Sequence, residues 1–383
     1  MAVNKITVDE FISLSKLYPV IDVRSESEYI HAHVPGANNL SLFNDAERKV
    51  VGTIYKQQSR EQAIKKGLEY FGPKMKDMIL FAERINRSIQ TDNKTFIVHC
   101  WRGGMRSAAV AWLLDMYGFK VYTLIGGYKA FRNWVLEQFT KPCAINIVGG
   151  YTGSGKTIIL QELKKKGEAI IDLEGIAGHR GSSFGRIGLP EQTSVEMFEN
   201  KLALELIKIK EEHPNKTIWV EDESQRIGAV SIPQKFWEKM RHSLVYFIDI
   251  PFEKRLAYII ESYGILDQRE LAAAISRIEK KLGGLETKTA IEYLNRNDFE
   301  NSFKILLKYY DKLYLKSLRS REIKKDDHSS SYVVDKESEF IKKGMNRNLN
   351  DEYSVDYKIQ VNSEQVDSKI NAIKLLTVFY GRN

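Results

Sequence analysis

Short apolar runs alternate with helical patterns through the first third of the chain. Three of these runs have the length and β-branched content of buried strands: residues 20–23, 95–98 and 121–124. Residues 107–117 have the small and apolar composition of a packed helix, and Gly118 just past them is a typical C-cap. Strand, loop, helix and strand in that order indicate a parallel α/β sheet. We therefore predict a first α/β domain over residues 1–138.

The alternation begins again after a short connection at residues 139–142, where a helical pattern stops at a proline. Four further runs are strand-like: residues 144–148, 169–173, 217–220 and 244–248. Residues 195–212 carry apolar side chains at helical spacing, and residues 252–318 have a mostly helical pattern. We predict a second parallel α/β domain with a helical C-terminal part over residues 143–320.

The last part of the chain, residues 321–383, is polar and charged. Such a composition lacks the apolar surface that a packed core needs, so we expect a flexible or loosely packed tail of no assigned role. Residues 373–380 are the exception, because they form an apolar patch that could dock on the body of the protein.

Composition limits the cellular compartment and the kinds of binding partner that we expect. Of the 383 residues, 43% are hydrophobic and 28% are charged, which is ordinary for a globular protein. No window approaches the ~18 consecutive apolar residues of a membrane span, no signal-peptide core follows the first residues, and two cysteines are too few for a disulfide framework. We therefore expect a cytoplasmic protein without a membrane partner. The net charge of +8 favours an anionic partner, either a nucleic acid or small phosphates.

A cysteine lies in the loop between a predicted strand and the helix that follows it. Backbone N–H groups near Gly103 and Gly104 and the charges of Arg102 and Arg106 would surround Cys100 with positive potential. Such surroundings lower the pKa of a thiol, and the thiolate is the nucleophilic form. We predict that Cys100 is catalytic; the alternative is a buried thiol at a strand end, where many free cysteines lie.

The pattern G-x-x-x-x-G-K-[ST] runs from Gly150 to Thr157, after a predicted strand and before a helix. In such loops the backbone N–H groups cradle phosphate oxygens, the lysine neutralises their charge, and the hydroxyl can ligate Mg²⁺. The predicted phosphate-binding residues are Gly150, Gly153, Ser154, Gly155, Lys156 and Thr157. The alternative is a glycine-rich turn with an incidental lysine.

An acidic partner for this loop is expected at the end of a later strand. Glu221 and Asp222 follow the run 217–220 and are candidates to hold a metal ion or to orient a water, unless they form a solvated acidic turn. From the residues alone, this half favours an ATPase, a GTPase or a small-molecule kinase. The loop does not distinguish a nucleotide from another diphosphate ester.

The first domain resembles the rhodanese family. Asp22-Val23-Arg24, the segment 33–40 and the Cys100 loop follow one another as they do in that family, whose members carry sulfur or selenium on the loop cysteine. The loop from Cys100 to Arg106 counts seven residues, where sulfurtransferases usually have six. The longer loop resembles related phosphatase loops, so the resemblance favours a tetrahedral, phosphate-like substrate such as selenophosphate over thiosulfate.

The fusion of the two domains resembles bacterial tRNA 2-selenouridine synthases over residues 1 to about 320. The segments that carry this resemblance are residues 100–107, 126–128, 149–157, 172–175, 179–185, 221–224, 227–228 and 282–284. The resemblance implies a transferase that acts on tRNA with 2-thiouridine at the wobble position. It implies S-geranylation from geranyl diphosphate, followed by replacement of the geranylthiol with selenium from selenophosphate.

The two sites divide this chemistry between them. The phosphate loop would hold the diphosphate leaving group, whose charge develops as the allylic C–O bond breaks. Cys100 and its loop would receive selenophosphate or carry the selenium, and Mg²⁺ at the phosphate loop is the one resident ion that the pattern suggests. The tRNA should bind chiefly through phosphate contacts.

Two other functions fit the same residues. One is a rhodanese-type sulfurtransferase coupled to a module that hydrolyses ATP or GTP, which predicts nucleotide-dependent turnover and a persulfide on Cys100. The other is a regulatory protein whose loops sense phosphate ligands, which predicts that Cys100→Ala leaves its function intact.

Overall fold

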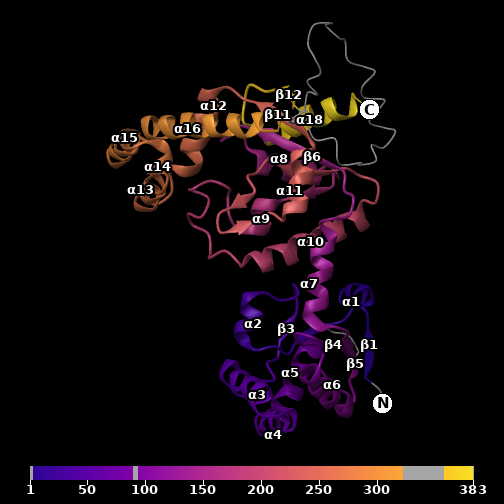
Figure 1. The fold of residues 1–383 in the computed structure, drawn as a ribbon. Coiled ribbons are helices and arrows are strands. Elements are labelled where there is room, and N and C mark those ends of the chain that lie inside the picture. Colours follow the sequence, from indigo (N-terminus) through magenta and orange to yellow (C-terminus); the bar gives the residue numbers. More distant parts are fainter. Residues whose placement is uncertain (1–2, 89–93, 322–357, 383) are drawn as a thin grey trace, which may run out of the picture. The chain divides into compact units, whose positions relative to one another are not determined.

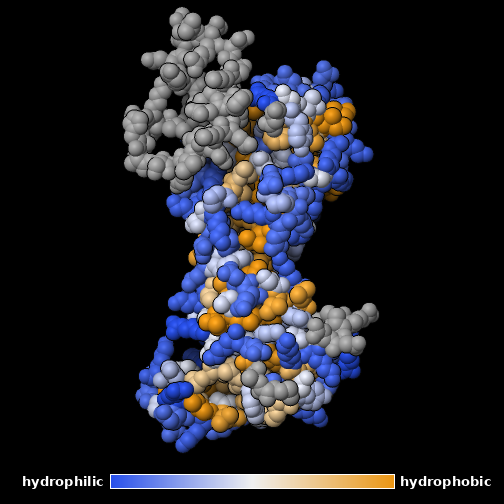
Figure 2. All heavy atoms as spheres, turned by 90° about the vertical axis from the view of Figure 1, so that its right-hand side faces the viewer, coloured by the Kyte–Doolittle hydropathy of each residue, from blue (hydrophilic) through white to orange (hydrophobic). Residues whose placement is uncertain are grey.

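The computed structural model describes residues 3–88, 94–321 and 358–382, which form two compact units (Figure 1). The first unit consists of Met1–Lys141 and Thr193–Ile207, and the second consists of Pro142–Gln192 and Lys208–Asn383. On the face shown in Figure 2, polar side chains cover most of each unit, and smaller apolar patches are scattered among these polar side chains. No helix of the described residues is both long and apolar enough to cross a membrane.

The first unit is built on a five-stranded parallel sheet with strand order β1-β5-β4-β2-β3. Its strands are β1 (Asn4–Ile6), β2 (Val20–Asp22), β3 (Asn38–Asn39), β4 (Thr95–His99) and β5 (Lys120–Leu124). The three predicted strands are confirmed as β2, β4 and β5. All five residues of β4 are buried, as the central strand of a parallel sheet requires.

Helices surround this sheet and continue the chain between its strands. They are α1 (Val8–Leu14), α2 (Glu26–His31), α3 (Asp45–Gln57), α4 (Arg60–Phe71), α5 (Met75–Ser88), α6 (Met105–Tyr117) and α7 (Gly127–Gln138), with a 3₁₀ turn at Gly72–Lys74. The predicted helix at 107–117 is confirmed as α6, and Gly118 ends it in the left-handed conformation with φ 109°. A capping box of Asn44 and Glu47 begins α3, and α3 lies beside α4 (Figure 1).

The second unit has its own five-stranded parallel sheet, with order β12-β11-β6-β8-β7. Its strands are β6 (Ile145–Gly150), β7 (Ile170–Ile171), β8 (Ile218–Glu221), β11 (Leu244–Asp249) and β12 (Lys358–Asn362), and a separate antiparallel pair joins β9 (Arg226–Ile227) to β10 (Val230–Ser231). The four strands predicted for this half are therefore confirmed. Both sheets place the strand before the predicted site, β4 or β6, at the centre, and ligands of parallel α/β sheets bind beyond the carboxyl ends of their strands.

The helical part predicted at 252–318 is also confirmed. The helices after β6 are α8 (Lys156–Lys165), α9 (Leu173–Ala177), α10 (Val195–Glu212), α11 (Gln234–Arg241), α12 (Phe252–Tyr263), α13 (Gln268–Arg277), α14 (Glu279–Leu282), α15 (Gly284–Asn295), α16 (Phe299–Arg319) and α18 (Ser368–Tyr380). Helices α12 to α16 share an apolar core that includes Leu256, Leu271 and Leu306. In Figure 1, α13, α14 and α15 form a group at one end of α16.

The domain boundaries predicted from the sequence need two corrections. Residues 193–207 belong to the first unit, because Asn200 Nδ2 donates to the carbonyl oxygen of His33 at 2.8 Å and Arg132 pairs with Glu199 at 2.5 Å. The second correction concerns the predicted polar tail. Residues 358–382 belong to the second unit, whereas residues 322–357 lie outside the described residues.

The C-terminal segment completes the sheet and the core of the second unit. Strand β12 pairs in parallel with β11 and buries Ile359 and Val361, which alternate with exposed residues. Helix α18 buries Ala372 and Leu375 in the core that contains α8. The average polarity of residues 321–383 concealed this short alternating strand, whereas the predicted docking of the apolar patch at 373–380 is confirmed.

Candidate active site

The Cys100 loop is held by the first residues of α7. The N–H groups of Tyr128 and Lys129 donate to the carbonyl oxygens of Cys100 and Trp101 at 2.8 and 2.9 Å. This approach is so close that a Cβ on Gly127, at φ 59°, would lie 2.3 Å from the Cys100 oxygen. Glycine is therefore the residue that allows α7 to begin against the loop. The pair Gly126-Gly127 thereby fixes the backbone that carries the thiol.

The Cys100 thiol faces hydrogen-bond donors at the beginning of α6. Its Sγ lies 3.3 Å from Ser107 Oγ, and the N–H groups of Ser107 and Gly104 also face it. Burial alone would raise the pKa of Cys100, but these groups and the charge of Arg106 outweigh burial and lower it. Cys100 is 3% exposed, yet it lies on the wall of a cavity of about 680 Å³. Ser107 is a residue of the site that the sequence patterns did not single out.

The positive charge beside the loop is positioned by a carboxylate. Glu28 Oε2 binds Arg106 Nη1 at 2.9 Å and Arg48 Nε at 2.7 Å. Burial would raise the pKa of Glu28, but the two guanidinium groups lower it, so the carboxylate stays ionised. Arg102 is exposed at the mouth of the same cavity. The structure thus brings Arg102, Gly104 and Arg106 together around Cys100, as predicted, and adds Glu28 as their support.

A buried ion pair supports the loop from the neighbouring strand. Arg24 Nη2 lies 2.6 Å from Asp22 Oδ2, and the Arg24 guanidinium stacks 3.8 Å above the ring of Tyr128. His99 is fully buried, and burial lowers its pKa, which keeps the imidazole neutral. These groups connect β2, β4 and α7 under the loop, so the Asp22-Val23-Arg24 pattern has a structural role here.

In the second unit, the predicted phosphate loop follows β6 and opens α8. Gly150, Gly153 and Gly155 have φ of 152°, 81° and 75°, which L side chains rarely adopt. Lys156 Nζ donates to the carbonyl oxygen of Gly150 at 3.0 Å, so the ammonium group lies across the loop where a phosphate would lie. Ser154 is fully buried, and its Oγ has no hydrogen-bond partner among the described residues. The six predicted residues therefore form one loop at a helix N-terminus.

A buried arginine and a tyrosine hold this loop in place. Arg255 Nη1 donates to the carbonyl oxygen of Thr152 at 3.0 Å, and Arg255 forms a two-fold ion pair with Asp311. The N–H group of Gly150 donates to the Tyr314 hydroxyl at 3.1 Å. The Tyr314 hydroxyl in turn donates to Asp222 at 2.7 Å. The loop is thus fixed by side chains from α12 and α16.

The carboxylate that meets Thr157 differs from the predicted ones. Thr157 Oγ1 donates to Glu174 Oε2 at 2.8 Å, and the N–H group of Glu174 donates to Glu221 Oε1 at 2.8 Å. Glu221 is fully buried; burial, followed by the charges of Asp172 and Glu174, raises its pKa well above the usual range. Glu221 therefore positions Glu174, which follows β7 and which sequence reasoning missed.

Asp222 contacts the phosphate loop indirectly. Its two oxygens bind the Tyr314 hydroxyl and the guanidinium of Arg321, so it anchors the phosphate loop through Tyr314. Within the described ranges, no group of three or more His, Cys, Asp or Glu side chains is arranged to hold a metal ion. The oxygen at Thr157 belongs to Glu174, whereas Glu221 and Asp222 reach the loop through Glu174 and Tyr314. That Glu221 or Asp222 holds a metal ion or orients a water stays a prediction.

Comparison with known proteins agrees with this two-site architecture. Residues 7–133 match the rhodanese-like domain, and residues 143–338 match the tRNA 2-selenouridine synthase AAA domain. A tRNA 2-selenouridine synthase of Nitrosomonas eutropha is 33% identical over 80% of this chain and 89% of its own length. That of Bdellovibrio bacteriovorus is 34% identical over 84% of this chain and 95% of its own.

The chain belongs to the tRNA 2-selenouridine synthase family. The predicted order of a rhodanese-like domain and a phosphate-loop domain is thereby confirmed. Among solved structures, one similar chain is the N-terminal domain of a putative ATP/GTP binding protein from Clostridium difficile 630. The match has 42% sequence identity, spans 35% of this chain and 99% of that domain, and has a TM-score of 0.31.

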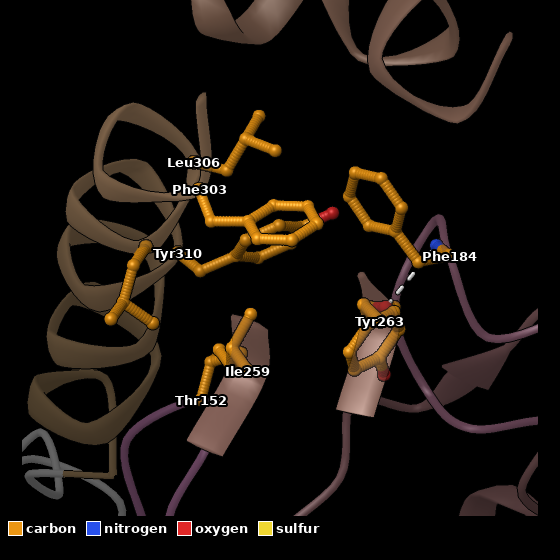
Figure 3. Close-up of a pocket in the computed structure, with 9 residues that line it drawn as sticks. Thr152, Phe184, Ile259, Tyr263, Phe303, Leu306 and Tyr310 are labelled. Atoms are coloured by element: carbon orange, nitrogen blue, oxygen red, sulfur yellow. Dashed lines mark hydrogen bonds between the residues drawn. The ribbon is translucent and has the colours of Figure 1, made fainter. Parts of the chain in front are cut away.

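In this member of the tRNA 2-selenouridine synthase family, a small apolar pocket borders the phosphate loop (Figure 3). Its volume is about 30 Å³, and Thr152 belongs both to its wall and to the loop. The remaining wall is mostly aromatic or aliphatic and comes from the loop after α9, from α12 and from α16: Ser182, Phe184, Ile259, Tyr263, Phe303, Leu306, Leu307 and Tyr310. In Figure 3 the rings of Phe303 and Tyr310 on α16 lie opposite the ring of Phe184. No sequence motif had indicated this pocket, because its residues come from four segments that are distant along the chain.

Proposed function

We propose that this protein converts 2-thiouridine at the wobble position of tRNA into 2-selenouridine. In the first step the thiocarbonyl sulfur is alkylated by geranyl diphosphate, and in the second step selenium from selenophosphate replaces the geranylthiol. Membership of the tRNA 2-selenouridine synthase family supports the overall conversion. The two anion-binding loops, one with a thiol and one without, support its division into two steps.

The apolar pocket beside Thr152 is the observation that carries the choice of donor. A prenyl diphosphate needs an anion site joined to a hydrocarbon site, whereas a nucleoside triphosphate brings a polar ribose and base. The pocket offers chiefly carbon atoms next to the phosphate loop. Its volume of about 30 Å³ is too small for a ten-carbon chain, so we expect the rings of Phe184 and Phe303 to move apart when the donor binds.

In the alkylation step, the sulfur forms a bond to C1 of the geranyl group as the C–O bond to diphosphate breaks. The uridine loses its N3 proton, and diphosphate leaves with the bonding electrons. The N–H groups of the phosphate loop and Lys156 would stabilise the charge that develops on the leaving oxygen. Because this charge is larger in the transition state than in the donor, these contacts would accelerate the reaction.

Mg²⁺ suits this loop if the donor supplies part of its coordination. Thr157 Oγ1 and Glu174 Oε2, 2.8 Å apart, are the oxygen ligands that Mg²⁺ prefers. Mg²⁺ sites of phosphate-transfer proteins commonly use one or two protein oxygens, with substrate phosphates and waters as the other ligands. When bound, the ion would neutralise diphosphate charge, while Glu221 would keep Glu174 in position.

In the second step, selenium of selenophosphate forms a bond to C2 of the alkylated base, and the geranylthiol leaves. Water then hydrolyses the Se–P bond and releases phosphate, so that the nucleoside keeps selenium. The loop at Cys100, with Gly104 N–H and the Arg106 guanidinium, would receive the tetrahedral selenophosphate or carry its selenium on Cys100. The lowered pKa of Cys100 supports a thiolate in this role.

Reconstitution tests this function. Purified full-length protein with 2-thiouridine tRNA, geranyl diphosphate, selenophosphate and Mg²⁺ should yield 2-selenouridine in nucleoside mass spectrometry. Cys100→Ser should stop at the geranylated or the unreacted nucleoside, with Cys143→Ser as its matched control. Lys156→Ala should slow geranylation, whereas Lys164→Ala, an exposed change on the same helix, should not.

The alternative function, a rhodanese-type sulfurtransferase, predicts different results. It requires ATP or GTP for turnover and forms a persulfide on Cys100 from thiosulfate, with no need for a prenyl donor. Selenouridine formation at the parent rate by both Cys100→Ser and Lys156→Ala would contradict the site assignment. Nucleotide-dependent turnover without any geranylated nucleoside would favour the sulfurtransferase.

A further inference from the structure

We propose that the cavity beside Cys100 binds the hydrocarbon chain on the sulfur of the alkylated nucleoside. The first unit would then receive the tRNA intermediate by its thioether substituent and not only by its phosphates. This inference rests on the proposed function and adds a binding site to it. The ligand class is an RNA nucleoside that carries an S-linked apolar chain.

The cavity lies between the Cys100 loop and the helices α3 and α4. Its volume of about 680 Å³ falls within the roughly 300–1,000 Å³ of pockets that enclose drug-sized ligands. Residues of α3, α4 and α6 line it together with Cys100, Trp101, Arg102 and Gly104. A selenophosphate ion is far smaller than this space, so it accounts for the loop but not for the rest of the cavity.

Much of the cavity wall is apolar, although the anion selenophosphate would make no favourable contact with apolar groups. Five of the large apolar or aromatic side chains that line the cavity are more than a third exposed: Tyr55, Ile64, Leu68, Trp101 and Met105. Leu68 is 57% exposed and Met105 is 47% exposed. Exposed apolar side chains gathered at one hollow are typical of a ligand-binding surface. A chain attached to the base would bury them beside the Cys100 sulfur.

The same cavity carries positive charge at its edge, which identifies the polar part of the ligand. Lys49, Lys56 and Arg102 are exposed there, and Arg48 and Arg106 are held by Glu28. Such charges complement the phosphates on either side of a nucleotide. Trp101 adds an exposed ring on the loop itself, and unpaired bases of RNA commonly stack on such rings. Apolar walls with a cationic edge therefore fit an alkylated nucleotide in RNA better than a free lipid or a free anion.

Binding of synthetic RNA to the full-length protein tests the proposal without any catalytic step. Two anticodon stem-loop RNAs would be compared, one with S-geranyl-2-thiouridine and one with S-methyl-2-thiouridine. We expect the geranyl RNA to bind about tenfold tighter or more, because its chain buries more apolar surface. Leu68→Ser on α4 should remove most of this difference. Ile30→Ser, a change at an even more exposed apolar residue on α2 outside the cavity, should preserve it.

A photoreactive diazirine at the end of the chain locates the bound group directly. Cross-links to peptides of α4 and α6 support the proposal, whereas cross-links confined to α12 and α16 would place the chain in the pocket of the second unit and overturn it. Equal affinity for the two RNAs would also overturn it. If the protein still makes the geranylated nucleoside in that case, the proposed function stands and only this binding site is lost. If the protein makes no geranylated nucleoside, yet binds the geranyl RNA more tightly than the methyl RNA by the predicted factor, this binding site stands and the proposed function is lost.

Discussion

The Cys100 loop and the phosphate loop both follow the central strand of a five-stranded parallel sheet, but different groups hold them. Backbone N–H groups at the start of α7 fix the first loop, and the charges around it are guanidinium groups. Side chains of α12 and α16 fix the second loop, and carboxylates with raised pKa values crowd behind it.

This difference has a chemical consequence. Cationic surroundings lower the pKa of a group that must lose a proton, as Cys100 must to form a thiolate. Burial and, after it, neighbouring carboxylates raise the pKa values of Glu221 and Glu223, and a cation such as Mg²⁺ close to them would lower these values. The same strand–loop–helix element thus carries a thiol among cationic groups in one unit and a lysine with buried carboxylates behind it in the other.

Loss of the buried ion pair behind the phosphate loop should have the largest effect on stability. Arg255→Ala leaves Asp311 without its partner and frees the carbonyl oxygen of Thr152, so we expect a loss of about 3–5 kcal/mol in the second unit. Hydrogen exchange of peptides from β6 and α8 measures it. Arg269→Ala, an exposed change on α13, serves as control, and an equal response of the two variants would refute a role for the ion pair.

A methyl group between α7 and the Cys100 loop should disturb the first unit by a smaller amount. Gly127→Ala adds both a strained φ and a close contact with the Cys100 carbonyl oxygen, and we expect a loss of roughly 1–3 kcal/mol. Gly118→Ala is the matched control, since it has φ 109° but no heavy atom within 4 Å of the added group. Hydrogen exchange of β4 and α7 should respond to the first variant more than to the second. Indistinguishable responses would mean that the close contact is relieved elsewhere.

The carboxylates behind the phosphate loop should make stability depend on pH. The pKa of Glu221 is raised in the folded protein, so its neutral form favours folding and this contribution is lost as pH rises toward that pKa. Between the ordinary carboxyl range and the raised pKa, the parent should lose up to about 1.4 kcal/mol per pH unit relative to Glu221→Gln. Urea unfolding over a pH series measures this difference. Glu253→Gln, an exposed change on α12, should give no such slope. Parallel pH courses of Glu221→Gln and the parent would contradict the raised pKa of Glu221.

The smallest effect is expected at the thiol. Ser107→Ala removes the hydroxyl that faces Cys100 Sγ and that lowers the pKa of the thiol. Because fewer groups then oppose the effect of burial, the pKa of Cys100 should rise. The pH profile of iodoacetamide labelling, followed by peptide mass spectrometry, reports this shift. Cys143 is an internal reference, because burial raises its pKa and its environment is unchanged. An unshifted Cys100 profile would mean that Arg106 and the backbone N–H groups suffice.

The strands and both loops could be predicted from sequence because their signals are local. Buried strands show as apolar runs, and the glycines of the phosphate loop keep the spacing that their φ angles demand. Glu174 could not be singled out as the partner of Thr157, because only the parallel pairing of β7 with β8 brings α9 to the phosphate loop. Glu221, which the sequence did indicate, is also a carboxylate, but in the structure its Oε1 accepts a hydrogen bond from the Glu174 N–H group. That role depends on burial and does not show in the sequence.

The cavity beside Cys100 could not be predicted from the sequence either. Ile64 and Leu68 on α4 and Met105 on α6 are ordinary apolar residues in the sequence, and their exposure follows only from the way α3 and α4 pack. The strand β12 escaped prediction for the opposite reason, because five alternating residues were averaged with a polar neighbourhood. In each case the missing information is a contact between segments that are distant along the chain.

Strand β12 also sets the order in which the protein can mature during synthesis. Residues 358–382 are made long after β11, and at about 5–20 residues per second the ribosome needs several seconds to supply them. Until then β11 presents an unpaired edge, and the phosphate loop lacks Val366, whose Cγ1 would lie 3.2 Å from a Cβ on Gly155. The strands of the thiol-bearing sheet have all been made before the phosphate loop is complete. A nascent chain would therefore acquire the fold around Cys100 first and the complete surroundings of the phosphate loop last.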